Sequence, residues 1–205
     1  MNEHTIYLVD DDDGVRRSVG FMLKTSGYRV ETFGSGDAFL AVARNLDPGC
    51  ILLDIRMPGK DGLEVQAELN ERGISYPVTI MTGHGDVDMA VKAMKAGAAD
   101  FIEKPFEKAT LLGALEHAAN RLEKNDRRNA RRDEARVLIN ALTPREKEVL
   151  GGLVKGHPNK TIGYDLGISP RTVEIHRANV MTKLKVFNLS DLLRIAFAAG
   201  VGEEE

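Results

Sequence analysis

Short apolar runs alternate with segments of helical periodicity through the first 122 residues of the chain. The runs have the length of buried strands, and the segments between them repeat apolar residues at the three- and four-residue spacing of an amphipathic helix. Glycines follow several helical segments, where a left-handed cap commonly ends a helix. Strands are predicted at 5–9, 28–33, 50–54, 77–82 and 100–103, and helices at 14–26, 36–44, 62–72, 86–96 and from about Phe106. Five strand–helix units with short connections predict a parallel sheet covered by helices on both faces.

Residues 137–205 keep helical periodicity and predict a compact, all-helical unit of four helices. Thr143, Pro144 and Glu146 form a helix start in which an N-cap, a first-turn proline and a capping-box partner agree. Three further helices are predicted at 160–166, 170–185 and 191–200, with Asn159, Ser169 and Ser190 as their N-caps. A glycine turn joins the second helix to the third, which is a helix–turn–helix signature.

The intervening residues, 123–136, are dominated by charged side chains and contain no glycine or proline. They lack apolar periodicity, so we expect the preceding helix to continue through them as a solvated, semi-rigid linker. A basic arm that contacts DNA phosphates is the alternative for this segment. The predicted organisation is a first domain over 1–122, a linker over 123–136 and a second domain over 137–205.

The formal net charge of −3 conceals a gradient along the chain. Residues 1–120 carry 12 Lys and Arg against 19 Asp and Glu, residues 121–136 carry 7 against 4, and residues 137–205 carry 9 against 8. The overall balance neither favours nor excludes a nucleic-acid partner, so the placement of individual charges has to decide.

Several classes of protein are disfavoured by the sequence. No apolar run is long enough to cross a bilayer, and the first residues lack the basic and apolar regions of a signal peptide. Cys50 is the one cysteine and lies in an apolar run, as expected of a buried residue in a reducing compartment. We therefore expect a soluble, cytoplasmic protein without membrane contact.

Polar side chains stand where four of the predicted strands end. Asp10 and Asp11 follow the first strand, Asp54 ends the third, Thr82 ends the fourth and Lys104 follows the fifth. The carboxyl edge of an open parallel sheet is where such folds bind ligands. Carboxylates, a hydroxyl and an amine suit a cation and a phosphoryl group better than general acid–base chemistry.

These residue types predict a phosphoryl-transfer site. Asp54 can accept a phosphoryl group as a mixed anhydride, and that transfer needs charge neutralisation more than proton transfer. Asp10 and Asp11, with Asp54 and a backbone oxygen, supply the hard ligands that Mg²⁺ or Mn²⁺ prefers. Thr82 and Lys104 can each bind one phosphoryl oxygen.

Asp12, Asp13 and His84 each allow two interpretations. Asp12 and Asp13 are expected to begin the first helix, where negative charge favours the helix dipole, rather than to bind metal directly. His84 lies between two glycines. It is either a solvated loop histidine or a residue that tunes dephosphorylation.

The first domain resembles the receiver domains of two-component response regulators. The resemblance is carried by Asp10, Asp11, Asp54, Met57-Pro58, Thr82 and Lys104-Pro105. It implies a doubly wound α/β fold with strand order 2-1-3-4-5, a cis Lys104–Pro105 bond, and phosphorylation of Asp54 by a sensor histidine kinase. Mg²⁺ is expected on Asp11, Asp54, the backbone carbonyl of Arg56 and, through water, Asp10.

The resemblance also implies a conformational switch formed by Thr82 and an aromatic residue three positions before Lys104. That residue is Phe101, which lacks the hydroxyl that many relatives carry, so we expect the ring to switch by packing alone. Arg56 and His84 are expected to flank the route of the water that removes the phosphoryl group.

The predicted helix over 170–185 has one face directed at the core and an opposite face exposed to solvent. Val173, Val180 and Leu184 lie within about 40° of one another on a helical wheel and are expected to be core. Ile175 is an apolar residue on the opposite face, and it is either a lone exposed aliphatic or a contact to a thymine methyl group. The candidates for phosphate contact are Lys160, Arg171, Arg177, Lys183 and Lys185.

The second domain resembles the LuxR-type helix–turn–helix family. The match lies at Thr143-Pro144-Arg145-Glu146, Asn159-Lys160, Ile168-Ser169, Arg171-Thr172-Val173 and His176. Glu174 stands where several relatives place a base-reading lysine, so it is expected either to accept from cytosine or to orient a nearby basic side chain. The full predicted DNA-binding set is Lys160, Arg171, Thr172, Glu174, Ile175, Arg177, Ala178, Asn179, Thr182, Lys183 and Lys185.

Both halves together resemble response regulators of the FixJ type, most specifically over 81–107 and 169–181. This implies a FixL-like kinase, homodimerisation of the phosphorylated form through the fourth helix and fifth strand, and a role with RNA polymerase, with activation of transcription expected. The chain is then not an enzyme beyond assisting its own phosphorylation and dephosphorylation. The alternatives are a Mg²⁺-dependent aspartyl-phosphate phosphatase and a phosphorelay sink or adaptor without a DNA role.

Overall fold

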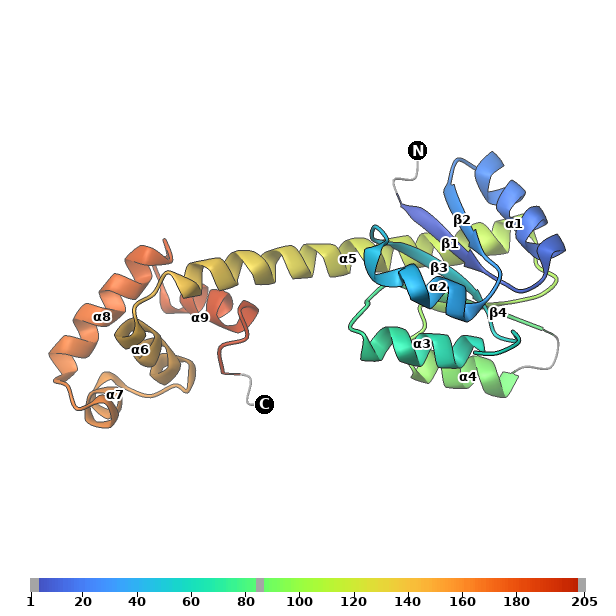
Figure 1. Cartoon of the computed structure of the whole chain (residues 1–205). Coiled ribbons are helices and arrows are strands. Elements are labelled where there is room, and N and C mark those ends of the chain that lie inside the picture. Colours follow the sequence, from blue (N-terminus) through green and yellow to red (C-terminus); the bar gives the residue numbers. More distant parts are fainter. Residues whose placement is uncertain (1–3, 84–86, 203–205) are drawn as a thin grey trace. The chain divides into compact units, whose positions relative to one another are not determined.

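The computed structural model describes residues 4–83 and 87–202 (Figure 1). The chain divides into two compact units, Met1–Asn125 and Asp126–Glu205. Each unit has its own hydrophobic core, and each is described below by itself.

A five-stranded parallel sheet forms the centre of the first unit. Its strands are β1 (Thr5–Val9), β2 (Arg29–Phe33), β3 (Gly49–Asp54), β4 (Val78–Thr82) and β5 (Asp100–Glu103). Their order is β2-β1-β3-β4-β5, and every pair is parallel. The prediction of a doubly wound receiver-type sheet is therefore confirmed. Every residue of β3 and β4 is buried, as expected of strands covered on both faces.

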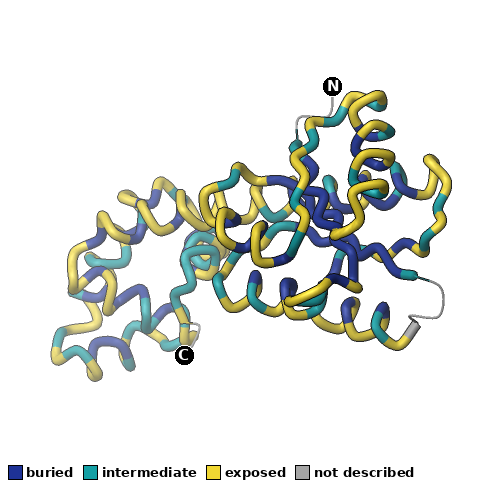
Figure 2. Tube along the Cα trace, turned by 45° about the vertical axis from the view of Figure 1, so that its right-hand side comes forward, coloured by how far each residue is buried: buried dark blue, intermediate teal, exposed yellow. Residues whose placement is uncertain are grey.

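Helices cover both faces of this sheet. They are α1 (Asp13–Thr25), α2 (Gly36–Val42) with a short 3₁₀ turn (Ala43–Asn45), α3 (Gly62–Glu71), α4 (Val87–Lys95) and the first part of α5, which begins at Lys108. Side chains of α2, α3 and α4 share one core with alternate residues of the strands, and those of α1 and α5 share the other. Figure 2 shows the buried strands between the partly exposed helices.

The second unit is all-helical, as predicted. It contains the end of α5, which finishes at Asn140, followed by α6 (Pro144–Val154), α7 (Asn159–Leu166), α8 (Pro170–Lys183) and α9 (Leu189–Ala198). Val173 and Val180 are fully buried and Leu184 is nearly so, which confirms the predicted core face of α8.

Two of the predicted helix caps of this unit are confirmed and two are wrong. Thr143 and Glu146 form a complete capping box, and Ser169 caps α8. Asn159 is the first residue of α7 instead of its cap, because Pro158 occupies the cap position without a side-chain bond. The cap of α9 is Asn188 and not Ser190: the Asn188 side-chain oxygen accepts from the Asp191 N–H at 2.8 Å, which starts the helix at Leu189.

The helix α8 also ends earlier than the predicted residue 185. Its last residue is Lys183, and Lys185 has a left-handed backbone with φ 55°. A left-handed residue cannot continue a right-handed helix, so the chain turns away at this point.

The charged segment 123–136 lies entirely within α5, a single helix of 33 residues from Lys108 to Asn140. The prediction that the helix runs on through this segment is confirmed. In the part of the chain that the structure describes, no helix is both long and apolar enough to cross a membrane.

Candidate functional site

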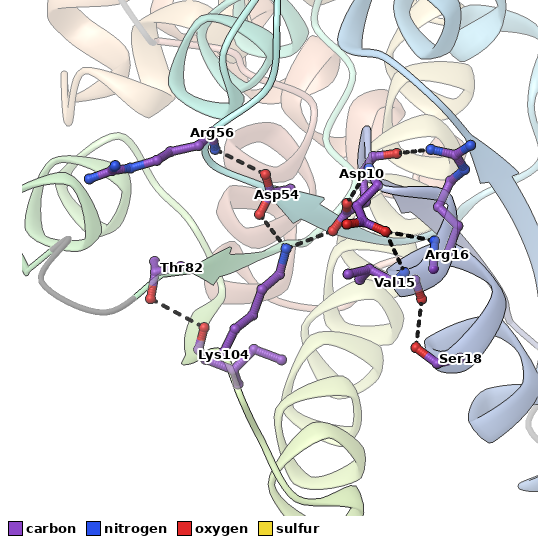
Figure 3. Close-up of polar contacts among 11 residues, drawn as sticks. Asp10, Val15, Arg16, Ser18, Asp54, Arg56, Thr82 and Lys104 are labelled. Atoms are coloured by element: carbon purple, nitrogen blue, oxygen red, sulfur yellow. Dashed lines mark hydrogen bonds and ion pairs between the residues drawn. The ribbon is translucent and has the colours of Figure 1, made fainter.

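The polar residues at the strand ends meet at one edge of the sheet (Figure 3). Because β1, β3, β4 and β5 are neighbours and all parallel, their carboxyl ends face the same way. This brings together Asp10, Asp54, Thr82 and Lys104, which the sequence spreads over 95 positions. These four polar residues therefore lie together at the carboxyl edge of the sheet.

Lys104 lies between two buried carboxylates. Its Nζ is 2.7 Å from Asp10 Oδ2 and 2.6 Å from Asp54 Oδ1. Asp10 is 1% exposed and Asp54 is 6% exposed, so both carboxylates need a partner to offset the loss of water. In this arrangement the lysine ammonium neutralises part of the negative charge.

The second oxygen of Asp54 is also held. Asp54 Oδ2 accepts from the backbone N–H of Arg56 at 3.1 Å, while the exposed Arg56 side chain points away from the carboxylate (Figure 3). This bond places the Arg56 backbone against the site. The role of its carbonyl as a metal ligand stays a prediction.

Asp10, Asp11 and Asp54 form a possible cation site. Each offers one carboxylate oxygen, and these oxygens lie within 4.8 Å of one another. Three hard anionic oxygens suit Mg²⁺, which commonly binds through one or two carboxylates and keeps several waters. Asp11 is exposed, so solvent can reach the cluster.

The electrostatics of the site favour a cation. Burial raises the pKa of Asp54, and the charges of Asp10 and Asp11 raise it further against the opposing effect of Lys104. Burial acts to lower the pKa of Lys104, but its hydrogen bonds to Asp10 and Asp54, together with the charges of those carboxylates, outweigh burial and raise the pKa. A further positive charge beside these carboxylates would stabilise the ionised Asp54 that can act as a nucleophile.

The helix-start interpretation of Asp12 and Asp13 agrees with the structure. Asp12 caps α1, where its Oδ1 accepts from the Gly14 and Val15 N–H groups at 2.6 and 3.0 Å. These bonds lower the pKa of Asp12. Asp13 pairs with Arg16 in the first turn of α1.

Arg16 is a site neighbour that sequence reasoning missed. Its Nη1 donates to the backbone carbonyl of Asp10 at 2.6 Å, which ties α1 to the loop that carries the acidic pair. The six-residue separation from Asp10 matches no motif, so no signal in the sequence indicated the contact.

The two predicted switch residues lie on neighbouring strands. Thr82 is buried, and its hydroxyl donates to the Ile102 carbonyl of β5 at 3.3 Å. Phe101, the preceding residue of β5, is 47% exposed. The Lys104–Pro105 bond is cis, as the resemblance implied. His84 lies outside the described residues.

The predicted DNA-binding residues occupy α8 and the residues around it. Arg177 and Thr172 are half-buried, and Ile175 is 55% exposed. The remaining predicted contacts are all exposed: Lys160, Arg171, Glu174, Ala178, Asn179, Thr182, Lys183 and Lys185. Within the described ranges, Glu174 has no ion-pair partner.

Lys183 has an intramolecular partner that the sequence did not indicate. Its Nζ lies 2.7 Å from Oε2 of Glu146, which is 4% exposed and belongs to the capping box of α6. The two residues are 37 positions apart, so no local pattern could have paired them. The contact fixes the C-terminal end of α8 to the start of α6.

Family models match both units of the chain. The response regulator receiver domain matches residues 6–116, and the luxR family of bacterial regulatory proteins matches residues 140–196. Together with the fold and the two sites, these matches define a DNA-binding response regulator.

Individual relatives narrow this class. The transcriptional regulatory protein FixJ of Azorhizobium caulinodans is 52% identical over 96% of this chain and 93% of the relative. Full-length FixJ from B. japonicum has a similar solved structure, with 42% identity, a TM-score of 0.62 and 98% of each chain covered. The response regulator StyR has a TM-score of 0.75 at 39% identity, covering 94% of this chain and 98% of StyR. The chain belongs to the FixJ family of DNA-binding response regulators.

These similarities give no support to a phosphatase or to a relay protein without a DNA role. The FixJ relatives are transcriptional regulators by name, in agreement with the expectation of a regulator rather than an enzyme.

Proposed function

We propose that this regulator receives a phosphoryl group on Asp54 from a sensor histidine kinase and then binds promoter DNA as a dimer. The observation that carries the proposal is the position of Asp54, a nearly buried carboxylate at the sheet edge with Lys104 Nζ at 2.6 Å. A FixL-like kinase and RNA polymerase are the proposed partners, with activation of transcription in the cytoplasm as the outcome.

In the proposed transfer, a carboxylate oxygen of Asp54 attacks the phosphorus of the phosphohistidine on the kinase. The new P–O bond forms a mixed anhydride while the P–N bond breaks, and the histidine nitrogen keeps the electron pair. Lys104 then pairs with one phosphoryl oxygen, and the Thr82 hydroxyl donates to another.

Asp11 and Asp54, with the Arg56 carbonyl and with Asp10 through water, would hold the Mg²⁺ or Mn²⁺ ion. When bound, the ion neutralises charge on the group being transferred. The carboxylate cluster within 4.8 Å supports this assignment.

Arg56 and His84 are proposed to set the lifetime of the acyl phosphate. The exposed Arg56 side chain extends from the residue whose N–H binds Asp54. In this structure it points away from the carboxylate (Figure 3), so it would turn toward the acyl phosphate to act on the attacking water. An Arg56→Ala variant should therefore change the rate of dephosphorylation.

The structure suggests how the phosphoryl group acts on the surface of the receiver unit. Movement of the Thr82 hydroxyl toward a phosphoryl oxygen breaks its 3.3 Å bond to the Ile102 carbonyl. Phe101 is the residue before Ile102 on β5, so loss of this bond would let that strand and the exposed ring repack. Val91 and Met94 on α4 are 47% and 41% exposed, and with Phe101 they supply apolar area for the proposed dimer surface.

In the dimer, each α8 is proposed to enter the major groove at one half of a two-fold site. We assign Ile175 a contact to a thymine methyl group and Glu174 a hydrogen bond from a cytosine amine. Lys183 can contact a phosphate while it stays paired with Glu146, because an ammonium has three donors.

Intact-mass analysis after incubation with acetyl phosphate and Mg²⁺ tests the phosphoryl step. The wild-type chain should gain the mass of one phosphoryl group, and Asp54→Ala should gain none. Asp47→Ala, which removes an exposed carboxylate before β3, is the matched control and should behave as wild type. Equal labelling of Asp54→Ala would show that another residue is the acceptor.

A further inference from the structure

In the part of α5 that precedes the core of the helical domain, three arginines share one face of the helix, with Glu134 at the edge of that face. Arg128, Arg131 and Arg132 lie seven, four and three residues before Ala135, and these spacings place all four residues on one face of an α-helix. Around the helix axis, Asp126 and Asp133 lie roughly 160–180° from Ala135, at about 100° per residue. One face of the helix is therefore basic and the opposite face acidic.

The basic face is also the face that packs against the helical domain. Ala135 is buried, and Ile139, one turn further on, belongs to the core cluster that includes Val180 and Leu184. The three arginines are exposed. They precede Ile139 by seven to eleven residues, or roughly 10–16 Å at 1.5 Å per residue, and so extend the side of α5 on which the domain lies.

The helix α5 joins the domain near the C-terminal end of α8. Glu146, in the first turn of α6, is paired with Lys183, the last residue of α8. Residues 141–143 alone separate α6 from α5. The end of α5 thus lies close to Lys183 and Lys185, which are proposed phosphate contacts. One turn of duplex DNA measures about 34 Å, so a duplex held by α8 is long enough to reach the arginines if it runs on past the end of α5.

The charges favour DNA over a second copy of the chain as the partner of this face. Two-fold pairing of the face with its own copy would bring like charges together, which opposes association. Duplex DNA carries one negative charge for about every 1.7 Å of its axis, and a guanidinium group binds phosphate with paired donors. Residues 137–205 are almost balanced, with 9 basic against 8 acidic residues, so the domain alone offers little net attraction.

From this placement we infer that Arg128, Arg131 and Arg132 form a second phosphate-binding surface, which contacts duplex DNA outside the groove read by α8. The inference rests on the proposed DNA-binding function and extends it to the helix that joins the two units. The three arginines then contribute affinity that depends strongly on salt and little on base sequence.

The test is the salt dependence of DNA binding by the full-length chain. A variant with Arg128→Gln, Arg131→Gln and Arg132→Gln keeps good helix formers in α5. After treatment with beryllofluoride, its affinity for a duplex that covers one mapped genomic site is measured by fluorescence anisotropy over a series of salt concentrations. Each phosphate contact contributes about 0.9 to the slope of log K against log salt, so the slope should fall by about 2.7 per protomer.

A matched control removes three positive charges elsewhere. Lys24→Gln, Arg29→Gln and Arg44→Gln change exposed residues of the receiver unit and should leave the slope as in wild type. A fall of less than about 1 in the arginine variant, or an equal fall in the control, overturns the inference. If activated wild type binds no mapped site, the proposed function itself fails, and the two failures are thereby distinguished.

Discussion

Replacing Glu146 by glutamine tests how the helix–turn–helix unit is held together. Oε2 of Glu146 accepts from the Thr143 N–H at 2.8 Å and from Lys183 Nζ at 2.7 Å. The side chain thereby caps α6 and joins it to the end of α8. Glutamine retains the shape and one acceptor oxygen, so the cap bond can persist, but the charge that faces Lys183 is lost.

The expected loss of stability is about 1–1.5 kcal/mol. A hydrogen bond to a charged group contributes about 1.5–3 kcal/mol, whereas exposed ion pairs contribute about 1 kcal/mol or less. The Lys183 side chain is 40% exposed and that of Glu146 is 5% exposed, so the pair lies between these limits. A loss of about 1.4 kcal/mol corresponds to a tenfold change in the opening equilibrium.

The effect should depend on pH in one direction. The hydrogen bond from Lys183, followed by those from Thr143, holds the pKa of Glu146 below its ordinary value. The pKa of Glu146 is lower in the folded state than in the unfolded state. The stabilisation from its ionised carboxylate is therefore fully present above the unfolded value of about 4.3 and is lost as the pH falls through the folded-state value. The difference between wild type and Glu146→Gln should therefore shrink in acid.

Hydrogen exchange followed by mass spectrometry measures this unit within the full-length chain. Peptides from α6 and α8 of Glu146→Gln should exchange about tenfold faster than in wild type at neutral pH. Glu148→Gln is the matched control, because Glu148 forms an exposed pair with Arg145 on the same helix, and it should have little effect. Equal exchange in the two variants would refute the reasoning.

Three further predictions concern the receiver unit. Mg²⁺ should raise its unfolding temperature, with a gain of about 2.7 kcal/mol at 100 times the dissociation constant, and Asp11→Asn should abolish most of that rise in calorimetry. Gly62→Ala should destabilise the unit by about 1–3 kcal/mol, because a Cβ there would lie 2.5 Å from the Asp54 carbonyl oxygen. The control Gly113→Ala should leave the stability unchanged, because a Cβ there meets nothing within 4 Å. Equal denaturation midpoints for the two variants would contradict this prediction. Met94→Asp should prevent dimerisation by the beryllofluoride-treated chain in light scattering, and an unchanged dimer would place the interface elsewhere.

Much of the fold was predictable because the local and global signals of the chain agree. The buried strands β3 and β4 are largely apolar runs that end at Asp54 and Thr82, and Lys104 follows β5. Parallel strands of one sheet have their carboxyl ends at the same edge, so the convergence of the site followed from the parallel arrangement. The capping box at Thr143 was equally local, since both of its partners lie within four residues.

Two helix caps were predicted wrongly because neighbouring residues competed for the cap position, and two hydrogen bonds were missed because they depend on helix packing. Asn188 and Ser190 are both good caps two positions apart, and the structure uses the asparagine, whose side-chain oxygen accepts from the Asp191 N–H. Pro158 occupies the cap position that was predicted for Asn159. The bonds from Arg16 to the Asp10 carbonyl and from Lys183 to Glu146 depend on how whole helices pack, which no spacing in the sequence encodes.

Genome-wide DNA occupancy in cells that carry wild type or Asp54→Ala tests most directly whether the phosphoacceptor controls DNA binding. The two proteins are compared at equal abundance under the inducing signal, with Asp47→Ala as control. Promoter occupancy should be high for wild type and for the control, and strongly reduced for Asp54→Ala. Undiminished occupancy by Asp54→Ala at the same promoters would contradict the proposed control of DNA binding by Asp54.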